Sequence, residues 1–171
     1  MIYYAGIGAR DTPEDICRKM SQAGKAMAKL GFTLRSGGAR GADSAFESGA
    51  VEQNADLTEI FLPFKAFNRH DSPLYGSCKE ARLLAAKYHP RWDILSCTGR
   101  DFHARNVYQV LGRDLKTPSS FILCWTEGGR IKGGTGQALR IAIEYNIPIL
   151  NFAVDDDEHI SNFILELAER K

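Results

Sequence analysis

The chain has 171 residues, which suits one domain with a proper hydrophobic core. Hydrophobic residues make up 44% and charged residues 25%, as in ordinary globular proteins, and a formal net charge of +1 excludes a strong overall basic field. No apolar run reaches the roughly 18 residues of a membrane helix, and the first residues lack the features of a signal peptide. We therefore expect a cytoplasmic protein that does not associate with membranes.

Apolar segments alternate with amphipathic ones along the whole chain. The expected strands are 2–7, 32–35, 59–64, 119–125 and 147–152. The expected helices are 13–30, 42–53, 78–88, 101–111, 138–145 and 160–167, and the polar segment 68–76 is predicted as a loop. This alternation predicts an α/β fold in one domain, residues 1–171, with an open, mainly parallel sheet and helices on both faces, a three-layer α/β/α arrangement.

Cysteine and histidine residues are scattered, without the spacing of a metal site. No C-x-x-C pair occurs, so the cysteines are predicted to be reduced and mostly buried thiols. The sequence thus predicts neither a metal site nor a cofactor. The residues concerned are Cys17, Cys78, Cys97 and Cys124, and His70, His89, His103 and His159.

Three glycine-rich turns follow predicted strands, at 6–10, 35–43 and 126–136. A strand, a glycine turn and a helix start bring free backbone N–H groups and the positive end of a helix dipole to one place, which favours phosphate. Because the carboxyl ends of parallel strands share one edge, we expect the three turns to converge there. The alternative interpretation is that they are tight turns that bind nothing.

Basic residues accompany these turns: Arg10, Arg40, Arg105, Arg130 and Lys132. Arginine suits phosphate or carboxylate oxygens. Asp43 could contact a ribose hydroxyl or a base, or cap the helix that follows, and Thr135 could cap a helix or bind a phosphate oxygen. The predicted ligand-binding residues are Gly8, Arg10, Ser36, Gly37, Gly38, Arg40, Gly41, Asp43, Arg105, Gly133, Gly134, Thr135 and Gly136.

The segment Ser36–Asp43, S-G-G-A-R-G-A-D, resembles the S-G-G-A-R-G-I-D signature of the DNA processing protein A (DprA/Smf) family. Gly133-Gly134-Thr135 is similar to the later G-G-T of that family. The wider group is the Rossmann-like SLOG superfamily, which includes the Lonely Guy phosphoribohydrolases. His103-Ala104-Arg105-Asn106 resembles their H-E-R-K helix, and Gly133–Gly136 resembles their G-G-x-G turn. The resemblance extends from Met1 to about Phe152.

The resemblance implies a Rossmann-like domain that binds a nucleotide or nucleotide-derived phosphate and senses or sequesters it. It also implies a homodimer and a compact member of the kind common in phages. One alternative is a DprA-like accessory protein of recombination that binds single-stranded DNA. The other is a nucleoside 5′-monophosphate phosphoribohydrolase. In the phosphoribohydrolase motif a catalytic glutamate stands where this chain has Arg140, so such an enzyme would use Arg105 with a relocated acid, Asp43 or Glu127.

Overall fold

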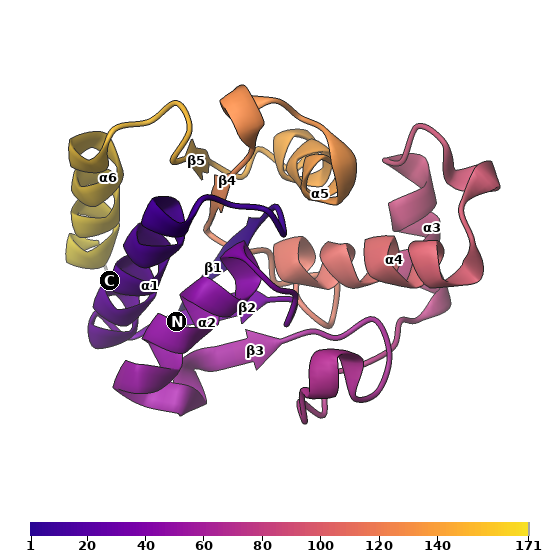
Figure 1. The fold of residues 1–171 in the computed structure, drawn as a ribbon, viewed down its shortest axis with the longest axis horizontal. Helices are drawn as coiled ribbons and strands as arrows, with labels where there is room; N and C mark the ends of the chain where they lie inside the picture. Colours follow the sequence, from indigo (N-terminus) through magenta and orange to yellow (C-terminus); the bar gives the residue numbers. More distant parts are fainter. Residues whose placement is uncertain (171) are drawn as a thin grey trace.

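The computed structural model describes residues 1–170, in which strands alternate with helices (Figure 1). The strands are β1 (Ile2–Gly8), β2 (Phe32–Ser36), β3 (Thr58–Ile60), β4 (Phe121–Trp125) and β5 (Ile149–Asn151). The α-helices are α1 (Glu14–Lys29), α2 (Ala42–Asn54), α3 (Lys79–Lys87), α4 (Cys97–Leu111), α5 (Gly133–Glu144) and α6 (Asp157–Glu169).

The strands form one sheet in the order β3-β2-β1-β4-β5, and every pair is parallel. This confirms the predicted α/β fold with a Rossmann-like open sheet. From β1 the chain adds β2 and β3 on one side, and then crosses over to add β4 and β5 on the other. The strand order therefore reverses between β1 and β4, where sheets of this kind bind ligands outside the carboxyl ends of their strands.

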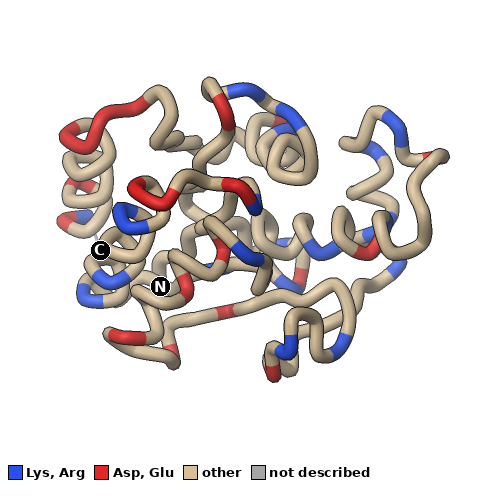
Figure 2. Tube along the Cα trace, viewed as in Figure 1, with Lys and Arg blue, Asp and Glu red and all other residues tan. Residues whose placement is uncertain are grey.

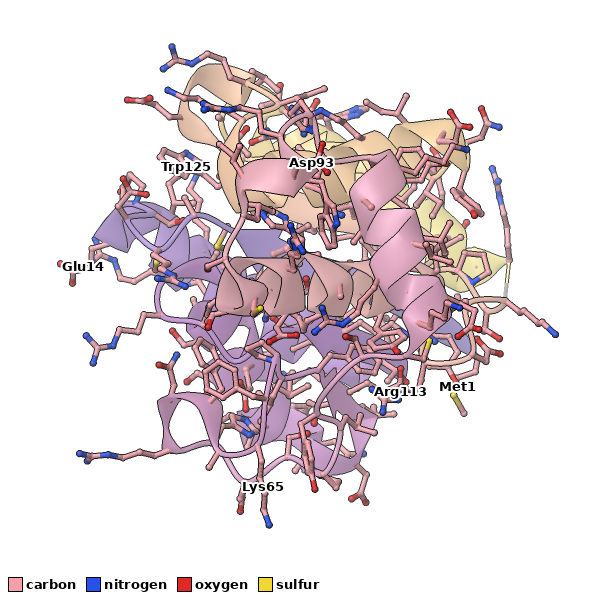
Figure 3. The ribbon with its side chains drawn as sticks, turned by 90° about the vertical axis from the view of Figure 1, so that its right-hand side faces the viewer. Met1, Glu14, Lys65, Asp93, Arg113 and Trp125 are labelled. Atoms are coloured by element: carbon pink, nitrogen blue, oxygen red, sulfur yellow. The ribbon has the colours of Figure 1, made fainter. Side chains whose placement is uncertain are left out.

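Helices cover both faces of the sheet, which confirms the predicted three layers. On one face, α1, α2 and α6 surround a core in which Tyr4 of β1 stacks on Phe121 of β4, with ring centroids 5.6 Å apart. On the other face, α3, α4 and α5 pack against Ala5 and Ile122. Figure 3 shows this second side of the molecule, with α3 in front of α4. The run Phe121–Trp125 is continuously apolar because both of its faces are covered.

Several elements differ in extent from the prediction, among them β3, α4 and α5. β3 ends at Ile60, not at residue 64, because the backbone N–H of Leu62 turns to the carbonyl of Leu74. α4 begins at Cys97, four residues earlier than expected, since the Ser96 hydroxyl accepts the Gly99 N–H at 3.0 Å and caps the helix. α5 begins at Gly133, so the third glycine turn ends inside the first turn of a helix.

The predicted burial of the cysteines is wrong for two of the four. All four thiols are free, but Cys78 and Cys97 are exposed, and only Cys124 is fully buried. The exposed pair stand at the beginnings of α3 and α4, where the chain enters each helix from solvent. Within residues 1–170, no helix is long and apolar enough to cross a membrane, and no group of three His, Cys, Asp or Glu side chains could hold a metal ion.

Helices α1 and α2 approach each other through glycines. A Cβ atom on Gly49 of α2 would overlap the backbone carbonyl of Ser21 in α1, and one on Gly24 would overlap the carbonyl of Phe46. This close contact lets both helices lie on the same face of the sheet, so that the start of α2 meets the carboxyl edge.

We predict that Gly49→Ala lowers the free energy of unfolding by about 1–3 kcal/mol, because the added methyl group forces two backbones apart. Urea unfolding measures the change. The matched control is Gly99→Ala, whose Cβ would meet only ordinary contacts at 3.4 Å or more. In that helix alanine should leave stability unchanged or raise it, and an equal loss in both variants would contradict this account of the α1–α2 contact.

Candidate functional site

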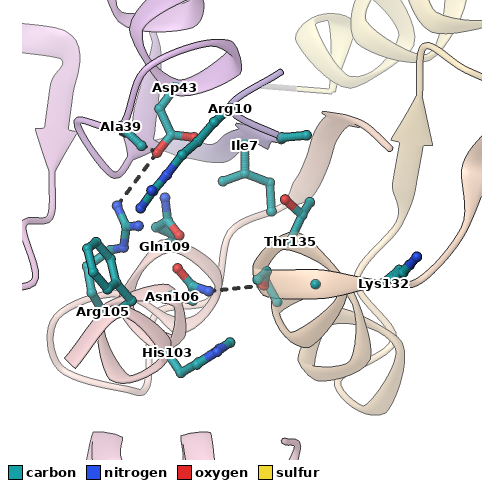
Figure 4. A pocket seen from close by; sticks show the side chains of 16 residues that line it. Ile7, Arg10, Ala39, Asp43, His103, Arg105, Asn106, Gln109, Lys132 and Thr135 are labelled. Carbon is teal, nitrogen blue, oxygen red and sulfur yellow. Dashed lines mark hydrogen bonds and ion pairs between the residues drawn. The ribbon is translucent and has the colours of Figure 1, made fainter. Parts of the chain in front are cut away.

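One cavity lies at the carboxyl edge of the sheet, at the reversal between β1 and β4, and for this position we call it the main cavity (Figure 4). Its volume is about 390 Å³. Three parts of the chain line it: the end of β1 with the turn after it (7–10), one side of α4 together with Ala39 and Asp43 beside it, and the beginning of α5 (132–135) with Ala138. All three glycine turns therefore contribute to the lining, as predicted, the second through Ala39 and Asp43, and α4 completes the wall.

The beginning of α5 presents free backbone N–H groups to this cavity. Its N-cap residue, Lys132, provides no side-chain cap, and the first bond within the helix runs from the Gly136 N–H to the Lys132 carbonyl. The N–H groups of the three residues between them have no partner inside the helix. A Cβ atom on Gly133 or Gly134 would meet nothing within 4 Å, so the backbone is open to a ligand here.

The wall formed by α4 is buried and polar. His103, Asn106 and Gln109 recur every three residues, and Arg105 lies beside them. Asn106 donates its side-chain N–H to the Gly134 carbonyl at 3.1 Å and so ties α4 to α5. By contrast, His103 Nδ1, Arg105 Nε and Gln109 Nε2 are buried without a hydrogen-bond partner among the described residues. Buried polar groups are rarely left unpaired, so these atoms mark a place for a polar ligand.

Arg105 is held in an ion pair inside the protein. It is 6% exposed, its Nη1 donates to the Gly37 carbonyl, and the same atom lies 3.6 Å from Oδ2 of Asp43. That carboxylate also accepts the Ala39 N–H at 3.3 Å. Burial raises the pKa of Asp43 to about 6, although Arg105 opposes the shift. Asp43 thus fixes the second glycine turn and the arginine at the same time, while Arg105 Nε has no hydrogen-bond partner among the described residues.

The glycines of the second turn are filled by the protein itself. A Cβ atom on Gly37 would overlap the Arg105 guanidinium, one on Gly38 would lie 2.8 Å from Leu62, and one on Gly41 would lie 2.6 Å from the Arg10 carbonyl. The Ser36 hydroxyl donates to the Gly6 carbonyl at 2.7 Å. Close packing between segments of the chain therefore explains why these positions hold glycine and serine.

The predicted ligand-binding residues therefore fall into three groups. Seven line the main cavity: Gly8, Arg10, Asp43, Arg105, Gly133, Gly134 and Thr135. Two line a second cavity beside the start of α2: Gly38 and Arg40. Four line neither cavity: Ser36, Gly37, Gly41 and Gly136.

The second cavity, which we call the loop cavity, has a volume of about 770 Å³. It lies between the start of α2 and the loop 68–71, and it also contacts Ala39, which lines the main cavity as well. Its lining carries two arginines, Arg40 and Arg69, and two acids, Glu47 and Asp71, and Glu47 pairs with His70 at 2.6 Å. The two cavities thus lie on either side of the second glycine turn.

Basic and acidic residues are both spread along the chain (Figure 2), but the charged residues that line the main cavity are mostly basic. Arg10, Arg105 and Lys132 face only one acid in its lining, Asp43, which leaves a net charge of +2 with histidine neutral. Arg10 is exposed and lies over the Phe102 ring at 5.3 Å, without an ion pair in residues 1–170. Of the two acids expected for a hydrolase, Glu127 is absent from this lining and pairs with Arg130.

Sequence reasoning missed Gln109 and Phe102. Gln109 is a single amide between Tyr108 and Val110 in an otherwise apolar stretch of α4, and it is only 2% exposed. The one signal that could have found it is its spacing of three from Asn106 and six from His103, which puts all three on one side of a helix.

Comparisons with known proteins agree with the fold. No protein-family model and no curated protein matches the chain. DNA processing protein A from Helicobacter pylori, described for a unique single-stranded DNA binding mode, is similar over 99% of this chain and 81% of that one, with a TM-score of 0.64 and 17% identity. The Moco carrier protein of Chlamydomonas rheinhardtii is similar over 88% of this chain and 74% of that one, with a TM-score of 0.53 and 17% identity. At these identities the similarity shows a shared Rossmann-like fold.

The His103 imidazole is neutral at the cavity wall. Burial lowers its pKa to about 4, and the His89 ring, with its centroid 4.2 Å away, adds to the shift. At neutral pH the ring therefore offers a ligand one donor or one acceptor and no charge. In the unfolded chain the same imidazole takes up a proton below about pH 6.5.

We predict that His103→Gln gains stability over the wild type as the pH falls from about 6.5 to about 4. In this range the unfolded wild type binds a proton that the folded protein excludes, so acid favours unfolding of the wild type only. The relative gain should reach about 2 kcal/mol in urea unfolding. Between about pH 7 and pH 8 the difference should stay constant, and a difference that does not change with acidification would contradict the assigned burial.

Proposed function

We propose that the protein binds a nucleotide or a nucleotide-derived phosphate in the main cavity and thereby senses or sequesters it. The observation that carries this proposal is the pairing of two features across one cavity. The open N-terminus of α5 lies on one side, and buried donors without partners lie on the other. Either feature alone also occurs where no anion binds, but together they describe a built site for an anion.

Each part of the cavity has a role in this proposal. The N–H groups of Gly133, Gly134 and Thr135 hold a phosphate, because the helix dipole and three free donors point at the same place. Arg10, which is exposed at the mouth, closes over the ligand. Asp43 contacts a ribose hydroxyl with its cavity-facing carboxylate. The volume of about 390 Å³ is within the range of small-molecule sites.

A second candidate, single-stranded nucleic acid, is favoured by a different observation. The exposed Phe64 lies next to Phe67 and Phe102, with ring centroids 5.5–6.2 Å apart, and this aromatic group borders the main cavity. The loop cavity with Arg40 and Arg69 lies close by. An exposed aromatic ring with arginines nearby is an arrangement used to stack bases of single-stranded nucleic acid. One of the two similar structures is also described for its single-stranded DNA binding.

For the nucleotide proposal, we predict that Thr135→Glu weakens ligand binding at least about tenfold, because a carboxylate in the first turn of α5 occupies and repels the anion site. The same carboxylate interacts favourably with the positive end of the helix dipole. The free energy of unfolding without ligand should therefore stay equal or rise by up to about 1 kcal/mol. A thermal-shift screen of nucleoside mono-, di- and triphosphates, ADP-ribose and cyclic nucleotides identifies the ligand. A ligand at 100 times its Kd raises the free energy of unfolding by about 2.7 kcal/mol.

Thr98→Glu is the matched control for this experiment. It places the same charge in the first turn of α4, at an exposed position outside both cavities. Ligand binding should be unchanged in this variant. If Thr135→Glu binds as well as the wild type, or if no compound of the panel stabilises the wild type, the proposed function is wrong.

For the nucleic-acid candidate, we predict that Arg40→Gln together with Arg69→Gln weakens binding of a fluorescent oligothymidylate. The slope of log K against log salt concentration should become shallower by the equivalent of about two phosphate contacts. Fluorescence anisotropy over a series of salt concentrations measures both effects. Both arginines are exposed, so the fold should be unaffected. Binding of mononucleotides with no binding of the oligonucleotide would reject this candidate.

A further inference from the structure

We infer that the main cavity has two oxyanion sites, and that its ligand carries two phosphate or carboxylate groups. This inference rests on the proposed function and adds a requirement to it. The first site is the N-terminus of α5. The second site, at the opposite end of the cavity, consists of Arg105 Nε, Gln109 Nε2 and the guanidinium of Arg10.

The second site is built from side chains that the fold has already fixed. Arg105 and Gln109 are 6% and 2% exposed, and both line the cavity. The Asp43 pair and the Gly37 carbonyl hold Nη1 of Arg105, whereas Nε of the same guanidinium has no partner among residues 1–170. In Figure 4, Arg105, Gln109 and Arg10 gather at one end of the cavity, and Thr135 lies at the other end, near the start of α5.

The atoms without partners at this end are donors. The Nε–H of arginine can only donate, and the Nε2 amide group of glutamine likewise donates. A buried donor that lacks an acceptor destabilises the protein by about 1–3 kcal/mol, more when the group is charged. A group rich in acceptor oxygens satisfies both donors at once. Because the cavity lining carries a net charge of +2, an anionic group fits better than a neutral carbonyl.

Asn106 separates the two sites. Its side-chain amide is already engaged, with the Gly134 carbonyl at 3.1 Å and the Gln137 side chain at 3.3 Å. It therefore forms a polar wall between the ends and does not compete for either anion. With one phosphate at α5, the ligand needs a second acidic group on the far side of Asn106 to reach Arg105 and Gln109.

The ligand class is thus a small nucleotide-derived molecule with two phosphoryl groups. The groups can be adjacent, as in a nucleoside 5′-diphosphate, or on separate positions of the sugar, as in a nucleoside 3′,5′-bisphosphate. Both classes have the same chemistry at the two ends and differ in the spacing of the anions. A monophosphate fills one site and leaves the donors of the other without acceptors.

Isothermal titration with AMP, ADP, adenosine 3′,5′-bisphosphate, phosphate and pyrophosphate tests this inference. We expect one of the two-phosphate nucleotides to bind the wild type at least about tenfold more tightly than AMP. Gln109→Leu should remove most of this preference and leave AMP binding nearly unchanged, whereas Arg10→Gln should weaken binding of the two-phosphate nucleotide more than binding of AMP. If the two phosphoryl groups of the ligand are adjacent, inorganic pyrophosphate should also bind the wild type more tightly than phosphate does. This comparison does not depend on the base.

Arg113→Gln is the matched control for Arg10→Gln. Arg113, labelled in Figure 3, is also exposed and lies over an aromatic ring, Tyr108, at 4.7 Å, but it does not line the cavity. The preference for two phosphates should survive this change of charge. Gln109→Leu has an independent readout, because removal of an unpaired buried amide should leave the Tm without ligand unchanged or higher.

The outcomes separate this inference from the proposed function. Equal affinity for AMP and both two-phosphate nucleotides, with AMP binding lost in Thr135→Glu, overturns the second site and leaves the phosphate site at α5. A preference that persists in both Gln109→Leu and Arg10→Gln also overturns it. If none of these compounds binds, or only an oligonucleotide does, the proposed function and the inference both fail. A lower Tm for Gln109→Leu without ligand would show that the amide has a structural partner, which contradicts the inference.

Discussion

The site depends on one buried ion pair, between Arg105 of α4 and Asp43 of α2. Both charges are nearly excluded from solvent, and breaking such a pair by removing one partner typically destabilises a protein by about 3–5 kcal/mol. The pair fixes the distance of α4 from the turn after β2, and it requires glycine at position 37, where any Cβ would overlap the guanidinium. Nε of the same arginine, which lines the cavity, keeps no hydrogen-bond partner among the described residues.

Two glycine motifs with similar composition have different physical roles in this chain. In the motif after β2, the space beside Gly37, Gly38 and Gly41 is filled by side chains and carbonyls of the protein. In the motif before α5, the space beside Gly133 and Gly134 is open. Glycine permits close approach in both cases, but the approaching group is the protein in one and solvent or ligand in the other. Composition alone cannot distinguish these two uses.

The sequence was sufficient for the fold and for the edge of the sheet at which the site lies. Alternating apolar and amphipathic segments predicted all five strands, because a parallel sheet buried on both faces needs continuous apolar runs. The sequence did not show where α4 and α5 begin, because Gly99 and Gly133 in their first turns are poor helix formers. There the start of the helix is set by a serine cap in α4 and by tertiary contacts in α5. The sequence also missed Gln109, since only the folded helix shows that this amide faces a cavity.

The arrangement at the switch point couples two halves of the sheet. The turn after β1 and the start of α2 lie on one side of the cavity, the start of α5 on the other, and α4 contacts both through Arg105 and Asn106. A ligand that satisfies donors on α4 and N–H groups on α5 would add a second connection between these halves. Part of its binding free energy would then restrict the motion of α4 and α5 relative to the sheet. A change in helix mobility of this kind is one that a sensing protein can transmit to a partner.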